Sequence, residues 1–361
     1  LPEAAPVKAE LSDFEKHIED GINFRESEIF GLAIEEFTAA ININPQSAEA
    51  YFQRGLTYKE IPPAATDRLR TEAEKQGDKN NKKLSIEDLS QAILLDPSNP
   101  EYWFERAITH WRLESGREQL AISDLNQAIA LAPMNPDYYA ARAEQHRRAA
   151  WKRNANNLLY STHDAGSCQL AIDDITRAIQ IDPTNVEFLN NRVDHYGCLI
   201  SSLEDESALI SRYGSEEIHS LVKLQIKDLT SVINLEPTNA AHYHSRGNFY
   251  EDSLRLHFLV PPGYVCKAYS CLPEWDIAYE LAANDYTQAI FYDPDNSKYY
   301  GDRAEVYSLL YNEGAMDPTL AHKITADYKK SREMGEGRWH NHRDEIIASI
   351  DSGDCAYAYQ V

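Results

Sequence analysis

A helix that is stopped by proline recurs six times along the chain of 361 residues. An apolar run precedes each stop, as in the segment AIDDITRAIQIDPTNVEFLNNR at 171–192. Proline cannot continue a helix, because it lacks the backbone N–H and its ring clashes with the preceding turn. In five cases an asparagine follows two residues later, where it is a favourable N-cap for a new helix. The sequence therefore predicts a series of helix–turn–helix units, with stops at Pro45, Pro97, Pro133, Pro183, Pro237 and Pro294.

The residues before each proline follow the period of a helix. Five positions before the proline lies a small residue, three positions earlier a large apolar residue, and four positions earlier again a slot that is usually alanine. Spacings of three and four mark one face of a helix, and alternating small and large residues suit close packing. In chain order the slots hold Ala33, Phe37 and Ala40; Ser85, Leu89 and Ala92; Ala121, Leu125 and Ala128; Ala171, Ile175 and Ala178; Gln225, Leu229 and Val232; and Ala282, Tyr286 and Ala289.

The helix after each turn carries a second pattern. It begins with an aromatic residue or leucine, continues with an arginine three positions later and a small or short residue next, and has tyrosine or histidine three positions further on. Together the two patterns resemble the tetratricopeptide repeat family, whose unit is a pair of antiparallel helices over about 34 residues.

The resemblance implies an all-α fold, namely a right-handed α-solenoid of about seven helix–turn–helix units with long insertions within the units along one rim. We expect an N-terminal tail at 1–13 and a capping helix and tail at 337–361. Between them the units are expected at 14–47, 48–99, 100–135, 136–185, 186–239, 240–296 and 297–336.

The chain departs from the family in the segment that joins the two helices of a unit. The family separates the small slots of the two helices by about twelve residues, whereas here the separation reaches 35 residues between Gly247 and Ala282. None of the extra length falls at the proline turns. The insertions are therefore expected to form a second layer on one edge of the array, where a long loop usually has a role.

The insertions differ in composition. Segment 62–83 is polar and charged, which indicates a helical extension and a solvated loop, 146–166 begins with basic residues, and 201–220 is acidic. Segment 256–275 is rich in apolar side chains, which either pack on neighbouring units or contact a partner. The candidates for partner contact are Phe258, Tyr264, Tyr269 and Trp275.

Arginine and carboxylate side chains stand in register along the array. Each carboxylate lies directly before the large apolar slot of a second helix, and each arginine lies in a first helix that packs between second helices. Arginine suits a planar, bidentate and partly buried pair, so we expect a structural ion pair in each unit; a cationic track for an anionic ligand is the alternative. The arginines are Arg54, Arg106, Arg142, Arg192, Arg246 and Arg303, and the carboxylates are Glu36, Asp88, Asp124, Asp174, Asp228 and Asp285.

The resemblance also implies a concave groove lined by first-helix residues beside the packing slots. Those positions here are Phe52, Leu56, Phe104, Ile108, Trp111, Arg147, Arg148, Asn190, Asp194, His244, Asn248 and Glu251. Some family members clamp a terminal carboxylate with paired lysine and asparagine residues, which this chain lacks because apolar residues occupy the slots. An extended or helical peptide with apolar anchors is the expected ligand.

Charge and composition narrow the possible partners. The formal net charge is −23, which disfavours nucleic acid because its phosphates would be repelled. No apolar stretch approaches the length of a membrane span. Five cysteines without a CxxC motif give no complete disulfide framework, although Cys266 and Cys271 share one insertion and can pair. The sequence slightly favours the cytoplasm over export, and the absence of an initial methionine fits either a removed leader or a trimmed chain.

No catalytic motif is apparent, and we expect no cofactor. The triplets HNH at 340–342 and HYH at 242–244 are weak metal candidates, because residues two apart on a helix point in different directions. The expected function is protein–protein interaction, as an adaptor, an assembly factor or a subunit of a larger complex. The alternatives are an enzyme or metal protein with its site in the insertions, and a nucleic-acid-binding regulator.

Overall fold

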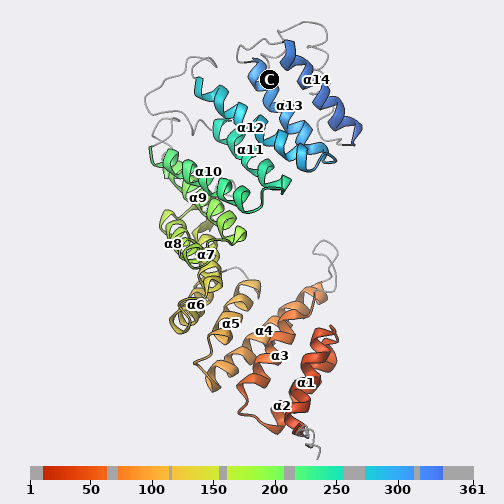
Figure 1. Cartoon of the computed structure of the whole chain (residues 1–361). Helices are drawn as coiled ribbons and strands as arrows, with labels where there is room; N and C mark the ends of the chain where they lie inside the picture. Colours follow the sequence, from red (N-terminus) through yellow and green to blue (C-terminus); the bar gives the residue numbers. More distant parts are fainter. Residues whose placement is uncertain are drawn as a thin grey trace, which may run out of the picture. The chain divides into compact units, whose positions relative to one another are not determined.

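The computed structural model describes residues 11–62, 72–113, 116–153, 161–206, 216–255, 273–312 and 318–335. Within these residues the chain forms fourteen α-helices and one two-stranded antiparallel ribbon (Figure 1). The helices between residues 13 and 181, and those between residues 186 and 333, each pack mainly on their neighbours in the sequence, which is the arrangement of a helical repeat array. The expectation of an α-solenoid fold is confirmed at this level.

The chain divides into two compact groups of elements, at 1–183 and 184–361. The first group contains α1 (Asp13–Glu26), α2 (Phe30–Ile43), α3 (Ala48–Glu60), α4 (Glu72–Leu95), α5 (Pro100–Leu113), α6 (Glu118–Leu131), α7 (Pro136–Ala150), β1 (Trp151–Arg153), β2 (Ser161–His163) and α8 (Ala165–Ile181). The second contains α9 (Val186–Glu206), α10 (Glu216–Leu235), α11 (Ala240–Arg255), α12 (Pro273–Tyr292), α13 (Ser297–Asn312) and α14 (Pro318–Glu333).

The proline turns are held by side chains of the helix that follows. Asn135 caps α7 by accepting a hydrogen bond from the Asp137 backbone at 3.0 Å, and Pro136 occupies the first helical position. In four of the following helices the first aromatic residue donates a hydrogen bond to the proline carbonyl of the turn: Trp103 to Pro97 at 3.0 Å, Tyr243 to Pro237 at 2.9 Å, and Tyr139 and Tyr300 in the same way. These bonds explain why an aromatic residue opens most of these helices.

The core consists of the small and large slots of the second helices. Phe37, Leu89 and Tyr286 are fully buried. A large side chain fits because the facing first helix carries a glycine: a Cβ atom on Gly247 would lie 2.7 Å from the Tyr286 ring. Gly21 stands in the same relation to Phe37, at 2.6 Å.

The insertions are partly helical. Residues 72–83 of the first insertion lengthen α4 at its N-terminal end, and α9 and α10 extend into segment 201–220 from its two ends. Segment 146–166 contains β1 and β2, in which Trp151 pairs with His163. The sequence did not predict these strands. The expected capping helix at 337–361 lies outside the described residues, and α14 ends two residues before Gly335, whose positive φ of 96° is typical of a helix terminus.

Candidate functional site

The first-helix arginines form bidentate ion pairs with aspartates of the second helices. Arg106 donates from Nε and Nη2 to the two carboxylate oxygens of Asp124, at 2.9 and 2.7 Å. The pairs Arg54–Asp88, Arg142–Asp174, Arg192–Asp228, Arg246–Asp285 and Arg303–Asp327 have the same geometry, with distances between 2.6 and 2.8 Å. These guanidinium groups are therefore engaged inside the array.

Five of these arginines also reach the preceding repeat, namely Arg54, Arg106, Arg142, Arg246 and Arg303. Nη1 of Arg106 donates to the Ser90 hydroxyl at 3.0 Å, and Nη1 of Arg303 donates to the Thr287 hydroxyl at 2.9 Å. The acceptor lies sixteen residues earlier in both cases, on the second helix of the repeat before. One side chain thus joins three helices, which is a structural reason for its recurrence.

Several of these ion pairs hold the arginine in its charged form. The hydrogen bonds that Arg54 donates to Asp88 raise the pKa of Arg54 above its ordinary value, despite the opposing effect of burial. Asp174 and Asp285 have the same effect on the pKa of Arg142 and Arg246.

Glu36 is an exception to the arginine pairs. The first unit has no arginine at the matching position, and Glu36 instead bonds Nδ1 of His17 at 2.5 Å. Its assignment to the arginine pairs is therefore corrected to a histidine–glutamate contact.

The apolar groove candidates lie partly in the core. Phe52 is buried and stacks on Tyr102 of the next repeat, with ring centroids 4.7 Å apart. Phe104 makes the corresponding contact with Tyr138 at 4.9 Å. Phe52 is thus not available as an anchor, which corrects its placement in an open groove, because the next repeat covers it. Leu56 and Ile108 remain partly exposed.

The basic groove candidates are tied to a neighbouring carboxylate. Arg147 and Arg148 both donate to Glu144, at 2.8 and 2.7 Å from their Nε atoms. Arg148 also lies over the ring of Trp111, 4.3 Å from its centroid. The cluster of Trp111, Glu144, Arg147 and Arg148 therefore holds two cations against one carboxylate, and contacts within the cluster engage both guanidinium groups.

The groove candidates of the second group lie around Tyr286. The Tyr286 hydroxyl lies 2.8 Å from Oδ1 of Asn248 and 2.8 Å from Oε2 of Glu251, so it can donate its single proton to either of them, and Glu251 is buried. His244 bonds Asp302 of the next repeat at 2.7 Å. The burial of Glu251 corrects its placement on an open surface. Asn190 is half-buried and Asp194 is exposed.

Most candidates for partner contact in segment 256–275 lie outside the described part of the chain. Phe258, Tyr264 and Tyr269 lie outside the described residues. Trp275 belongs to α12, but the side chains of its first residues lie outside the described part of the chain.

A row of exposed leucines was missed by the sequence reasoning. The residue directly before the first small slot of the second helix is leucine in all six repeats, and between 38% and 51% of each residue is exposed. The leucines, hereafter the leucine row, are Leu32, Leu84, Leu120 and Leu170 in the first group and Leu224 and Leu281 in the second. The signal was present, because an invariant apolar residue beside the buried slot turns about 100° away from the core.

Candidate metal ligands are not brought together. His242 bonds Glu236 at 2.6 Å, whereas His244 bonds Asp302 on another helix. No cluster of three or more histidine, cysteine or acidic side chains that could hold a metal occurs within the described ranges. The triplet at 340–342 lies outside those ranges.

Two further properties bear on the environment of the chain. None of the helices in the described ranges has the length and apolar content that a bilayer-spanning segment needs. Cys168 and Cys198 are buried, and each of them is disulfide-bonded. Cys266 and Cys271 lie outside the described residues.

Comparisons with known proteins identify the fold. No protein-family model matches the chain, and no curated protein matches its sequence. Among solved structures, the C-terminal part of a TPR repeat-containing protein from Cytophaga hutchinsonii matches with a TM-score of 0.58 and 13% identity, over 91% of this chain and 99% of that chain. A tetratricopeptide repeat protein from Parabacteroides merdae matches at 0.46 and 12% over 94% and 99%. YrrB, described as a TPR protein with an unusual peptide-binding site, matches at 0.42 and 13% over 73% and 96%. The helix pairs, their proline turns and the first of these likenesses show that the chain has the tetratricopeptide repeat fold.

Proposed function

We propose that this chain is a protein-binding scaffold and that the leucine row contacts its partner. The observation that carries the proposal is one exposed leucine at the same position of six repeats. A single exposed leucine is ordinary on a protein surface, but a periodic row is not required by the fold, because this position does not enter the core.

The row belongs to the second helices and is independent of the first-helix groove. Many groove candidates are engaged with other side chains of the array, whereas each leucine of the row keeps between 38% and 51% of its surface exposed. Acidic residues flank the row: Glu35, Glu87 and Asp173 lie three positions after Leu32, Leu84 and Leu170 and are exposed. The partner that suits this surface is a polypeptide that presents apolar side chains among basic ones.

Replacement of two leucines by aspartate tests the proposal. We expect Leu120→Asp/Leu170→Asp to change the free energy of unfolding by about 0.5 kcal/mol or less per site, because both side chains are exposed. The variant should lose partners that the unaltered chain retains in affinity capture followed by cross-linking mass spectrometry.

A matched control separates loss of the leucines from added charge. Gln119→Asp/Gln127→Asp adds the same two charges at exposed positions of α6 and should retain the partners. If the leucine variant captures the same proteins as the control, the row is not the binding surface. The groove then becomes the next candidate, with Leu56 and Ile108 as the residues to replace.

The compartment is part of the same proposal. Buried cysteines that are disulfide-bonded are typical of exported proteins, because cytosolic thiols are kept reduced. This state favours an exported scaffold over a cytoplasmic one.

A further inference from the structure

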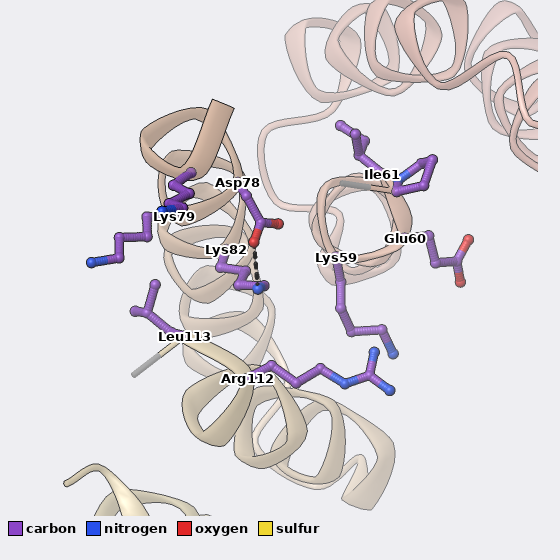
Figure 2. A pocket seen from close by; sticks show the side chains of 10 residues that line it. Lys59, Glu60, Ile61, Asp78, Lys79, Lys82, Arg112 and Leu113 are labelled. Carbon is purple, nitrogen blue, oxygen red and sulfur yellow. Dashed lines mark hydrogen bonds and ion pairs between the residues drawn. The ribbon is translucent and has the colours of Figure 1, made fainter. Parts of the chain in front are cut away.

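A cleft of about 640 Å³ opens at the edge of the first group of helices, among α3, α4 and α5 (Figure 2). Its cationic lining residues are Lys59, Lys75, Lys79, Lys82 and Arg112. Its carboxylates are Glu60 and Asp78, and a small apolar part comes from Ile61, Pro62 and Leu113. The volume lies in the range of small-molecule sites.

The insertion at 62–83 builds one wall of this cleft. Lys75, Lys79 and Lys82 have the spacing i, i+4 and i+7, so they share one face of α4. This part of α4 precedes the repeat core, whose first slot is Ser85. The cleft is therefore a feature of the insertion and not of the repeat itself.

The cleft is positive although the chain is strongly negative. Its lining contains five cations and two carboxylates, in a chain whose formal net charge is −23. Lys59 is paired with Glu105 and Glu60 with Arg25, so these two outer partners cancel each other.

Two of the cations are free to meet a ligand. Lys82 is held by Asp78 at 2.8 Å, as the dashed line in Figure 2 marks. Lys79 and Arg112 have no carboxylate partner within the described residues, and Arg112 is exposed beside the ring of Trp111. Unpaired like charges around one cavity repel one another, and a bound anion would relieve that repulsion.

We propose that this cleft binds a ligand carrying two closely spaced phosphate groups. A phosphate group carries a charge of about −1.5 to −2, which is more than a carboxylate carries, and two linked phosphate groups can each meet one of the two free cations, Lys79 and Arg112. Lysine ammonium groups suit phosphate oxygens as point charges. The ligand is either a small diphosphate compound or a doubly phosphorylated segment of a protein, and the proposal does not depend on the leucine row.

Isothermal titration calorimetry of inorganic pyrophosphate binding to the full chain at low salt tests this site. We expect saturable binding that Lys79→Gln/Arg112→Gln weakens at least about fivefold, because two charges that face the ligand are removed. The control Lys223→Gln/Lys227→Gln removes two exposed lysines of α10 and should bind as the unaltered chain does.

A variant that binds pyrophosphate more tightly gives a second test, because a misfolded chain would lose affinity and not gain it. Asp78→Asn removes a repelling carboxylate and releases Lys82, so it should tighten pyrophosphate binding about twofold to fivefold. A doubly phosphorylated serine peptide, tested on the same variants, assigns the source: whichever of peptide and pyrophosphate binds more tightly indicates the natural ligand.

Three results would overturn the proposal. Pyrophosphate fails to saturate the chain, the control variant loses as much affinity as Lys79→Gln/Arg112→Gln, or an unphosphorylated hexaglutamate peptide binds more tightly than both phosphate ligands.

Discussion

At the scale of single residues, the arginine–aspartate pairs are the most regular feature of the array. Arg106 and Asp124 are each largely buried, and removing one partner leaves the other charge without compensation. We expect Arg106→Met to lower the free energy of unfolding by about 2–4 kcal/mol, after allowance for the partial exposure of the guanidinium group. Urea denaturation followed by circular dichroism measures this loss.

A double-mutant cycle checks that the pair itself is responsible. Arg106→Met/Asp124→Leu should cost less than the sum of the two single changes. By contrast, Arg148→Gln at an exposed pair should cost no more than about 1 kcal/mol. Equal losses for Arg106→Met and Arg148→Gln would contradict a buried structural role.

Two glycines of the second group make a matched pair. A Cβ on Gly247 would meet the Tyr286 ring at 2.7 Å, whereas a Cβ on Gly197 would meet only Gln225 at an ordinary 3.7 Å. We expect Gly247→Ala to destabilise by about 1–3 kcal/mol through overpacking. Gly197→Ala should stabilise by about 0.5–1 kcal/mol, because alanine is the better helix former. Thermal denaturation of both variants decides whether the ring is as tightly enclosed as the distance implies.

Two histidines should make stability depend on pH. Burial lowers the pKa of His110 and of His146 below the ordinary value of 6.5; the nearby Asp124 and Asp174 oppose the shift. Arg106 and Arg117 add to it for His110, and Arg142 does so for His146. The unfolded chain therefore takes up protons more readily, and the free energy of unfolding should fall as the pH drops below about 6.5.

Other repeats supply the test of this dependence. Tyrosine occupies the same slot at Tyr58, Tyr196, Tyr250 and Tyr307. His110→Tyr/His146→Tyr should show a smaller loss of stability between pH 7 and pH 5 in urea denaturation. An unchanged slope would mean that other groups cause the decline.

At the scale of elements, α4 shows what an insertion adds to a repeat. Its N-terminal extension contains Gly77, and a Cβ there would meet nothing within 4 Å. We expect Gly77→Ala to stabilise the extension by about 0.5–1 kcal/mol. Amide hydrogen exchange should then slow in the residues after 72, with little change in α5.

Gly116 provides the contrasting case. It also has open space around it, but its φ is +92°. Gly116→Ala should destabilise by about 1 kcal/mol, because the left-handed conformation is strained for alanine. Stabilisation by both alanines would show that backbone conformation does not decide the effect.

The helices and turns were largely predictable from the sequence, whereas the contacts between side chains of different repeats were less so. The prolines and the spacing of Ala33, Phe37 and Ala40 gave the helix pairs, because turn chemistry and helical period are local properties. The register of arginine and aspartate is likewise visible in the sequence. The burial of Phe52 was not, because Tyr102 of another repeat covers it, and contacts between repeats leave no local pattern.

A helical extension in segment 62–83 was predicted, but its starting residue and the strands β1 and β2 were not, for a different reason. A polar insertion has no apolar period from which its boundaries can be read. The leucine row is visible in the sequence, but a periodic apolar residue usually indicates a core position. Leu120 is exposed although it directly precedes the core residue Ala121.

At the scale of the whole molecule, the oxidation state of Cys168 and Cys198 tests whether the chain occurs in an oxidising compartment. Cys168 and Cys198 are each disulfide-bonded. In the chain purified without reductant and then denatured, iodoacetamide should leave both unlabelled until dithiothreitol is added. Peptide mass spectrometry reads the labels, and labelling of both residues before reduction would remove the argument for export.

The third hydrogen bond of Arg54, Arg106, Arg142, Arg246 and Arg303 has a consequence for how the array unfolds. Arg106 donates hydrogen bonds to Ser90 of the preceding repeat and to Asp124 of its own repeat. Unfolding of one repeat therefore removes a hydrogen bond from its neighbour. Such shared anchors make helical arrays lose several repeats in one step instead of peeling from an end. Replacement of a single arginine would then lower the stability of the preceding repeat as well as that of its own.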